Sequence, residues 1–132
     1  LDELFERSDH VTVHAPSLPE TEKMIGAAQL ARLRDGATLV NTSRGSVIDH
    51  DALLAECRAR RLNVCLDVTT PEPLPPDSPF RALDNVIITP HVSGAGYYGY
   101  FLIGDTTIQA LDCFAGRPVQ GAVPLERYTT IA

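Results

Sequence analysis

The sequence predicts an α/β fold in which helices cover a parallel sheet. Short apolar segments rich in β-branched residues recur at residues 10–14, 37–40, 63–68 and 85–89, and such segments are typical of strands in a helix-covered sheet. Segments with helical patterning lie between them, which favours right-handed crossovers between parallel strands. The carboxyl ends of the strands then share one edge, where open α/β sheets bind ligands.

Composition favours one small domain in a reducing compartment. The 132 residues are 44% hydrophobic, enough for a sizeable core. A net charge of -6 without any long basic run disfavours nucleic acid and anionic membranes as partners. No apolar stretch approaches the roughly 18 residues that span a membrane. Cys57, Cys65 and Cys113 are odd in number and widely spaced, which predicts a cytoplasmic location.

The chain opens on a helical pattern. Residues 1–5 have apolar positions at helical spacing but neither an initiating Met nor a capping residue, so we expect the chain to begin inside a larger protein. The strand at 10–14 ends before Pro16, because proline cannot continue a ladder. Thr21 is expected to cap a short turn over residues 22–25.

A second helix is expected after Gly26. Leu30 and Leu33 lie on one face of it, and Gly36 is expected to close it just beyond the C-cap. The strand that follows, 37–40, leads directly into a small polar turn.

That turn, Asn41-Thr42-Ser43-Arg44-Gly45, holds a single arginine. A planar guanidinium grips carboxylates through two hydrogen bonds, and at the carboxyl end of a strand it would meet a ligand. An isolated arginine is more often a solvated surface residue. Whether Arg44 binds a ligand therefore has to be judged from other residues that could form a site with it.

Asp49 is expected to be the N-cap of a third helix, with Asp51 in its first turn and Leu53 and Leu54 facing the core. Asp49-His50-Asp51 could be imagined as metal ligands. Three adjacent residues at a helix start cannot easily converge on one ion, so no metal site is predicted.

The last two strands enclose a proline-rich loop, 69–79, which is expected to be too stiff for a helix and too polar for the core. Glu72 lies inside it between two prolines, and the strand at 85–89 runs directly into Pro90 and His91. A helix is expected over 100–114, followed by a tail with weak pattern.

The topology gathers titratable side chains along one sheet edge. The residues that lie at or after the carboxyl ends of predicted strands are His14, Arg44, Asp67, Glu72 and His91. A histidine, a carboxylate that orients it and stabilises its cationic form, and an arginine that holds an anion together make an acid/base site. Each residue alone would carry little information.

Four motifs in fixed order resemble the D-isomer-specific 2-hydroxyacid dehydrogenases. They are His-x-Pro at 14–16, Asn-x-Ser-Arg-Gly at 41–45, Asp-Val-x-x-x-Glu-Pro at 67–73 and Thr-Pro-His-x-x-Gly at 89–94. The resemblance covers about residues 1–120. It implies a Rossmann-like domain present only as its second half: residues 1–95 carry the catalytic side chains, and 96–132 form a helix and tail that return toward a missing substrate domain.

The resemblance also implies the chemistry. Arg44 would bind the carboxylate and carbonyl of a small 2-hydroxy or 2-oxo acid, His91 would give or take the proton, and Glu72 would pair with His91. The cofactor would be NAD, with NADP left open because the selecting residue lies outside this sequence, and the enzyme would be a homodimer. Asp67 would face the nicotinamide amide. The residues that the resemblance places against the cofactor are His14, Pro16, Thr21, Thr42, Ser43, Asp67, His91 and Gly94.

A second glycine pattern has the wrong context. Residues 94–99 satisfy Gly-x-Gly-x-x-Gly after a strand and before a helix, but no convincing strand follows Asp112, as a dinucleotide fingerprint requires. The aromatic segment 97–101 is interpreted either as core packing or as a contact with another domain or subunit.

Two further functions stay open beside an NAD-dependent dehydrogenase. One is a dinucleotide-sensing regulatory protein of the same fold without turnover, and the other is a degenerate structural fragment. Turnover of a 2-oxo acid that depends on His91 separates the first hypothesis from both.

Overall fold

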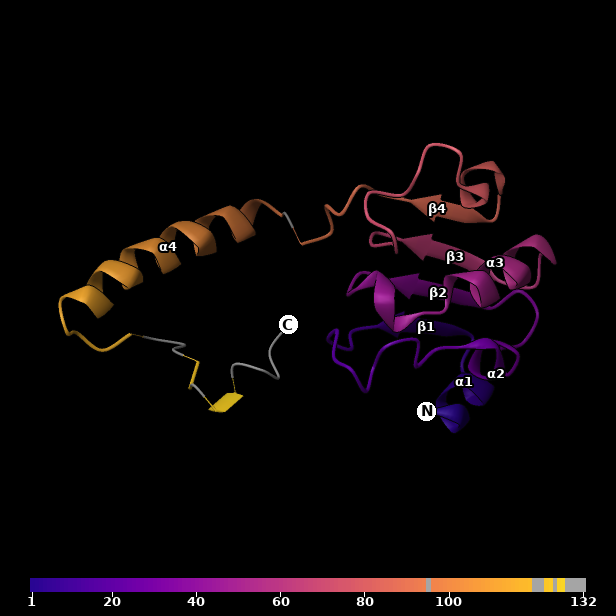
Figure 1. Ribbon diagram of the computed structural model, residues 1–132, viewed down its shortest axis with the longest axis horizontal. Coiled ribbons are helices and arrows are strands. Elements are labelled where there is room, and N and C mark those ends of the chain that lie inside the picture. Colours follow the sequence, from indigo (N-terminus) through magenta and orange to yellow (C-terminus); the bar gives the residue numbers. More distant parts are fainter. Residues whose placement is uncertain (95, 120–122, 125, 128–132) are drawn as a thin grey trace. The chain divides into compact units, whose positions relative to one another are not determined.

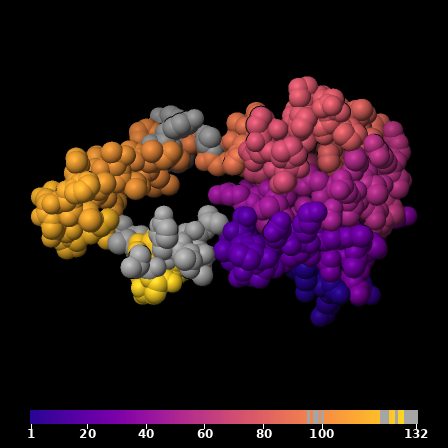
Figure 2. All heavy atoms as spheres, viewed as in Figure 1, coloured from indigo at the N-terminus to yellow at the C-terminus, as the bar shows by residue number. Residues whose placement is uncertain are grey.

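The computed structural model describes residues 1–94, 96–119, 123–124 and 126–127. The chain forms two compact units, Leu1–His91 and Val92–Ala132. In the space-filling view the first unit is a continuous body, coloured from indigo to pink (Figure 2). All the strands described belong to this unit.

The first unit is built on a parallel sheet, as the sequence predicts. Its strands are β1 (His10–Val13), β2 (Thr38–Asn41), β3 (Asn63–Leu66) and β4 (Val86–Ile88), in the order β1-β2-β3-β4 (Figure 1). The register aligns Thr12 with Val40, Val40 with Cys65 and Cys65 with Ile87. The strands end one or two residues from the predicted bounds, so Asp67 lies just beyond β3.

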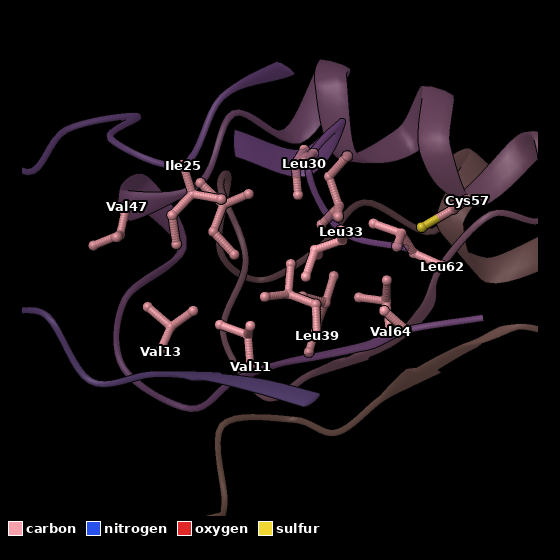
Figure 3. Close-up of a cluster of buried hydrophobic side chains, with 14 of the residues drawn as sticks. Val11, Val13, Ile25, Leu30, Leu33, Leu39, Val47, Cys57, Leu62 and Val64 are labelled. Carbon is pink, nitrogen blue, oxygen red and sulfur yellow. The ribbon is translucent and has the colours of Figure 1, made fainter. Parts of the chain in front are cut away.

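One face of the sheet carries the core. Val11, Val13, Leu39, Val64 and Leu66 are buried, while the residues that alternate with them are exposed or half-buried. This alternation follows from the two-residue period of a strand. The core cluster includes side chains from α1 (Asp2–Arg7), α2 (Ala27–Leu30) and α3 (His50–Arg58). Figure 3 shows Leu30 of α2 and Cys57 of α3 above the buried face.

The helix predicted up to Gly36 is shorter than expected. α2 ends at Leu30, because the guanidinium of Arg61 binds the carbonyls that a longer helix would use: Nη2 donates to Leu30 O at 2.7 Å and Nη1 to Leu33 O at 2.6 Å. Gly36, with φ of 81°, instead shapes the turn into β2. Leu33 is nevertheless buried.

Two capping predictions have different outcomes. Asp49 caps α3, since its Oδ1 accepts hydrogen bonds from the N–H groups of Asp51 and Ala52. The prediction that Thr21 caps the turn after it is wrong: its Oγ1 accepts from Leu18 N at 2.8 Å and donates to Pro16 O at 2.6 Å. Thr21 therefore fixes the turn that precedes it.

The proline-rich loop enters the core, contrary to expectation. Leu74 is 8% exposed and Thr69 is 7% exposed, and Leu74 belongs to the core cluster. The loop leads into a short 3-10 helix, η2 (Pro79–Ala82), in which Phe80 is also buried. The neighbouring prolines hid in the sequence that Leu74, in the middle of the loop, is an apolar anchor.

The second unit contains the helix α4 (Tyr97–Phe114), which begins three residues before the predicted start. Gly116, with φ of 69°, follows its end as predicted. The side chains of Tyr97, Tyr98 and Tyr100 lie outside the described residues, and with them the role expected of the aromatic segment. Within the part of the chain that is described, no helix is both long and apolar enough to cross a membrane.

Candidate active site

A cavity of about 260 Å³ lies at the carboxyl edge of the sheet, beside β3 and β4. Three of the predicted site residues, Asp67, Glu72 and His91, contribute to its wall. Asp67 follows β3 directly, His91 comes shortly after β4, and Glu72 reaches the cavity from the proline-rich loop. The other lining residues are Thr69, Pro73, Leu74, Arg81, Ile88, Thr89 and Pro90.

His91 and Glu72 form a hydrogen-bonded pair. The distance between His91 Nδ1 and Glu72 Oε1 is 2.5 Å. An ionised carboxylate only accepts hydrogen bonds, so Nδ1–H is the donor, and Nε2 remains for another partner. In the neutral ring Nε2 is a base, and in the imidazolium it is an acid.

The backbone of His91 is held in an unusual conformation. Its φ of 53° lies in the left-handed region, which side chains other than glycine rarely adopt. The N–H of His91 donates to Asp67 O at 3.0 Å, so the residue is tied to the end of β3. Such strain persists where the surrounding structure enforces it, and it clusters at active sites.

Asp67 is almost fully buried, at 5% exposure. Thr89 Oγ1 donates to its Oδ1 at 2.5 Å, and its own N–H donates to Asn41 O at 3.0 Å. A buried carboxylate with hydrogen-bond partners is a fixed acceptor, and it suits the amide N–H group of a carboxamide ligand.

Arg44 lies on a turn that Asn41 closes. Asn41 is fully buried; its Nδ2 donates to Arg44 O at 2.9 Å, and its Oδ1 accepts from Ser43 N at 3.0 Å. Ser43 Oγ donates to Ala15 O, which ties the turn to the segment after β1. The Arg44 guanidinium is exposed, with Nη1 on Ser43 O at 2.8 Å, and Arg44 is not among the residues that line the cavity.

Gly45 allows this turn to approach the proline-rich loop. A Cβ at Gly45 would lie 2.2 Å from both the C and the O atoms of Thr69. No side chain fits in that space, so the glycine brings the end of β2 against the loop that carries Glu72. Neither Gly45 nor Asn41 was predicted as a site residue. Asn41 could have been found from the sequence, because it is a polar residue at an inward-facing position at the end of a buried strand.

The remaining predicted contacts lie elsewhere on the edge or beyond it. His14 is exposed, with Nε2 3.0 Å from Thr12 Oγ1. Thr42 is exposed and Pro16 is half-buried. Gly94 belongs to the second unit. In the described part of the chain, no three His, Cys, Asp or Glu side chains are grouped so that they could hold a metal ion.

A parallel sheet with a histidine–carboxylate pair and a fixed acceptor at its carboxyl edge defines a dinucleotide-binding α/β domain. The donor set fits a nicotinamide, since the Asp67 carboxylate is an acceptor for its amide. Residues 1–93 match the D-isomer specific 2-hydroxyacid dehydrogenase, NAD binding domain. The chain therefore belongs to this family, which confirms the resemblance.

Similar proteins include two enzymes with different names. The chain is 44% identical over 98 residues, 74% of its length, to a glyoxylate reductase of Korarchaeum cryptofilum. It is 38% identical over 124 residues, 84% of its length, to D-3-phosphoglycerate dehydrogenase 1 of Saccharomyces cerevisiae. It spans 30% and 26% of the lengths of these two relatives.

A solved structure supports the same assignment. The D-isomer specific 2-hydroxyacid dehydrogenase from Xanthobacter autotrophicus Py2, in complex with NADPH and MES, superimposes with a TM-score of 0.80 at 35% identity. The alignment covers 96% of this chain and 52% of that chain. The family match ends at residue 93, so the glycine pattern at 94–99 is not part of it.

Proposed function

We propose that this chain is the catalytic half of the nucleotide-binding domain in an oxidoreductase that transfers a hydride between NAD(P) and a small D-2-hydroxy or 2-oxo acid. The observation that carries the proposal is the contact of His91 Nδ1 with Glu72 Oε1 in a cavity that also holds Asp67. Membership of the family supports the choice of substrate class.

The nicotinamide cofactor, when bound, supplies or accepts the hydride. Arg44 is proposed to hold the substrate carboxylate and to polarise its carbonyl. His91 Nε2 gives a proton to the oxygen that becomes the hydroxyl during reduction, and it takes that proton back during oxidation. Glu72 holds Nδ1–H and stabilises the imidazolium.

The cofactor contacts are also proposals. Asp67 accepts a hydrogen bond from the carboxamide, and Ser43 and Pro16 line the nicotinamide side through small groups on the edge of the sheet. Thr21 lies toward the adenosine, and His14, Thr42, His91 and Gly94 complete the set. Both NAD and NADP are compatible with these residues.

The whole enzyme is proposed to be a cytoplasmic homodimer that acts on small molecules, not on nucleic acid or membranes. The free state of Cys57, Cys65 and Cys113 supports a reducing compartment. The net charge of -6 disfavours polyanionic partners. A dinucleotide-sensing regulatory protein is the alternative; it requires binding without turnover.

The test is oxidation of NADH and of NADPH by the full-length protein with a panel of 2-oxo acids that includes glyoxylate. We expect turnover that requires both a reduced cofactor and an acid. Cofactor binding measured by fluorescence, without consumption of any acid in the panel, would support the sensor instead. Gel filtration of the same sample tests the homodimer.

A further inference from the structure

The loop that carries Glu72 has few means of fixing its own backbone. Residues 69–79 include five prolines, and proline has no N–H to donate. They are Pro71, Pro73, Pro75, Pro76 and Pro79. The position of the loop therefore depends on its anchors and on donors from other residues. Thr69 Oγ1 donates to Pro71 O at 2.8 Å, and Leu74 is buried in the core.

Arg81 supplies two further donors from outside the loop. Its Nε donates to Pro75 O at 2.9 Å, and its Nη2 donates to Leu74 O at 2.8 Å. A planar guanidinium that makes two hydrogen bonds fixes orientation as well as distance. Arg81 is itself held in place because its neighbour in η2, Phe80, is buried in the core.

The contact between Glu72 and His91 needs such support. The two side chains are 40% and 49% exposed, so burial does not hold them together. The His91 backbone is fixed by its hydrogen bond to Asp67 O. On the other side, Glu72 is only two residues from Leu74, whose carbonyl Arg81 binds. Arg81 also lines the cavity that contains the pair.

We propose that Arg81 is a positioning residue, which holds the proline-rich loop so that the Glu72 carboxylate stays on His91 Nδ1. The inference rests on the proposed function, because that function gives the pair its chemical role. The guanidinium acts on the backbone of the loop and does not touch the reacting atoms.

The first test is the position of the imidazole protons of His91 in this chain. The 15N shifts of Nδ1 and Nε2 distinguish the two neutral tautomers. We expect the parent chain to carry the proton on Nδ1, and Arg81→Met to show a mixture of tautomers with an otherwise unchanged amide spectrum. If Arg81→Met does not fold, Arg81→Lys is used, because lysine keeps the charge but lacks the planar guanidinium that binds both carbonyls.

Arg60 provides a matched control. It is an exposed arginine that also makes two contacts, with Asp84 at 3.1 and 3.0 Å, and it does not bind the loop. Arg60→Met is expected to keep the parent tautomer. A parent chain without the Nδ1–H form, or an Arg81 variant that keeps it, would overturn the positioning role.

The second test separates positioning from substrate binding in the full-length protein. Because Arg81→Met removes two hydrogen bonds, we expect kcat for reduction to fall by roughly 5- to 30-fold. KM for the 2-oxo acid should change by less than about twofold. Arg81→Lys should restore part of the loss. A raised KM with kcat unchanged would assign Arg81 to the substrate instead. If the unsubstituted protein has no turnover, the proposed function fails while the tautomer experiment still decides the role of Arg81.

Discussion

Individual side chains in this domain gain their roles from backbone contacts with distant residues. His91 is held by Asp67 O, and the turn that carries Arg44 is closed by the amide of Asn41. Asn41 is fully buried and satisfies two backbone groups, so it links the end of β2 to the turn that carries Arg44. The pairing of Glu72 with His91 likewise joins residues from a loop and a strand end.

His50 is a second histidine near the proline-rich loop, but its environment is different. Its Nδ1–H donates to Ile48 O at 3.1 Å, its ring packs edge-on against Phe80, and its buried Nε2 has no partner among the described residues. Burial lowers the pKa of His50 below the ordinary value of 6.5, although the nearby carboxylates of Asp49 and Asp51 oppose this shift. Folding therefore favours the neutral form of this ring.

This environment predicts a pH dependence of stability. Well above pH 6.5 the ring is neutral in both states, and as pH falls through that value the unfolded chain takes up a proton before the folded chain does. The free energy of unfolding should therefore decrease as pH falls from 7 to 5, and His50→Gln should make that slope shallower. Urea unfolding of both chains across this range measures the slopes. Equal slopes would show that His50 is not kept neutral by folding.

The elements of the fold meet at one close contact, between the end of β2 and the proline-rich loop. Gly45 begins η1 (Gly45–Val47), and the Cβ that it lacks would overlap the Thr69 carbonyl. The turn that carries Arg44 and the loop that carries Glu72 are therefore packed directly against each other. A change at Gly45 should affect both.

We predict that Gly45→Ala destabilises the chain by about 1–3 kcal/mol, the usual cost of overpacking. Gly104→Ala is the control, because Gly104 lies inside α4 with nothing within 4 Å of the added Cβ; that substitution should be neutral or stabilise by up to about 1 kcal/mol. Chemical denaturation of the three chains gives both values. Equal effects of the two substitutions would show that Thr69 does not constrain Gly45.

The strands and their parallel order were predictable because each strand is a short apolar run that ends in a turn residue or proline. The length of α2 was not, since it depends on Arg61, which lies about thirty residues away and replaces the helical hydrogen bonds. Leu74 was assigned to a polar loop for a similar reason. The composition of the loop indicated that Leu74 is exposed to solvent. Its burial instead depends on the packing of η2 against the sheet.

The part of the candidate site that could be predicted is the part whose position follows from the topology of the sheet. Strand ends place Asp67 and His91 on one edge of a parallel sheet, and the cavity contains both residues. The prediction that Glu72, in the proline-rich loop, is the partner of His91 came from the resemblance. Asn41, Gly45 and Arg81 were missed because their roles consist of contacts to backbone atoms of other segments, which residue spacing does not reveal.

Considered as a whole, the chain combines one nucleotide-binding half-domain with a separate helical unit. It spans less than a third of the two enzymes to which it was compared. The first unit holds all the proposed acid/base residues, and α4 exposes large apolar side chains such as Phe101, Leu111 and Phe114.

The most direct test of the account is the rate of 2-oxo acid reduction by the full-length protein with His91→Asn. A general acid contributes about 10²- to 10⁴-fold to such a rate, so we predict a loss of that size at saturating cofactor. His10→Asn, at an exposed position in β1, is the control and should leave the rate unchanged. A His91→Asn protein that reduces the acid at the parent rate would contradict the assignment of His91 as the proton donor.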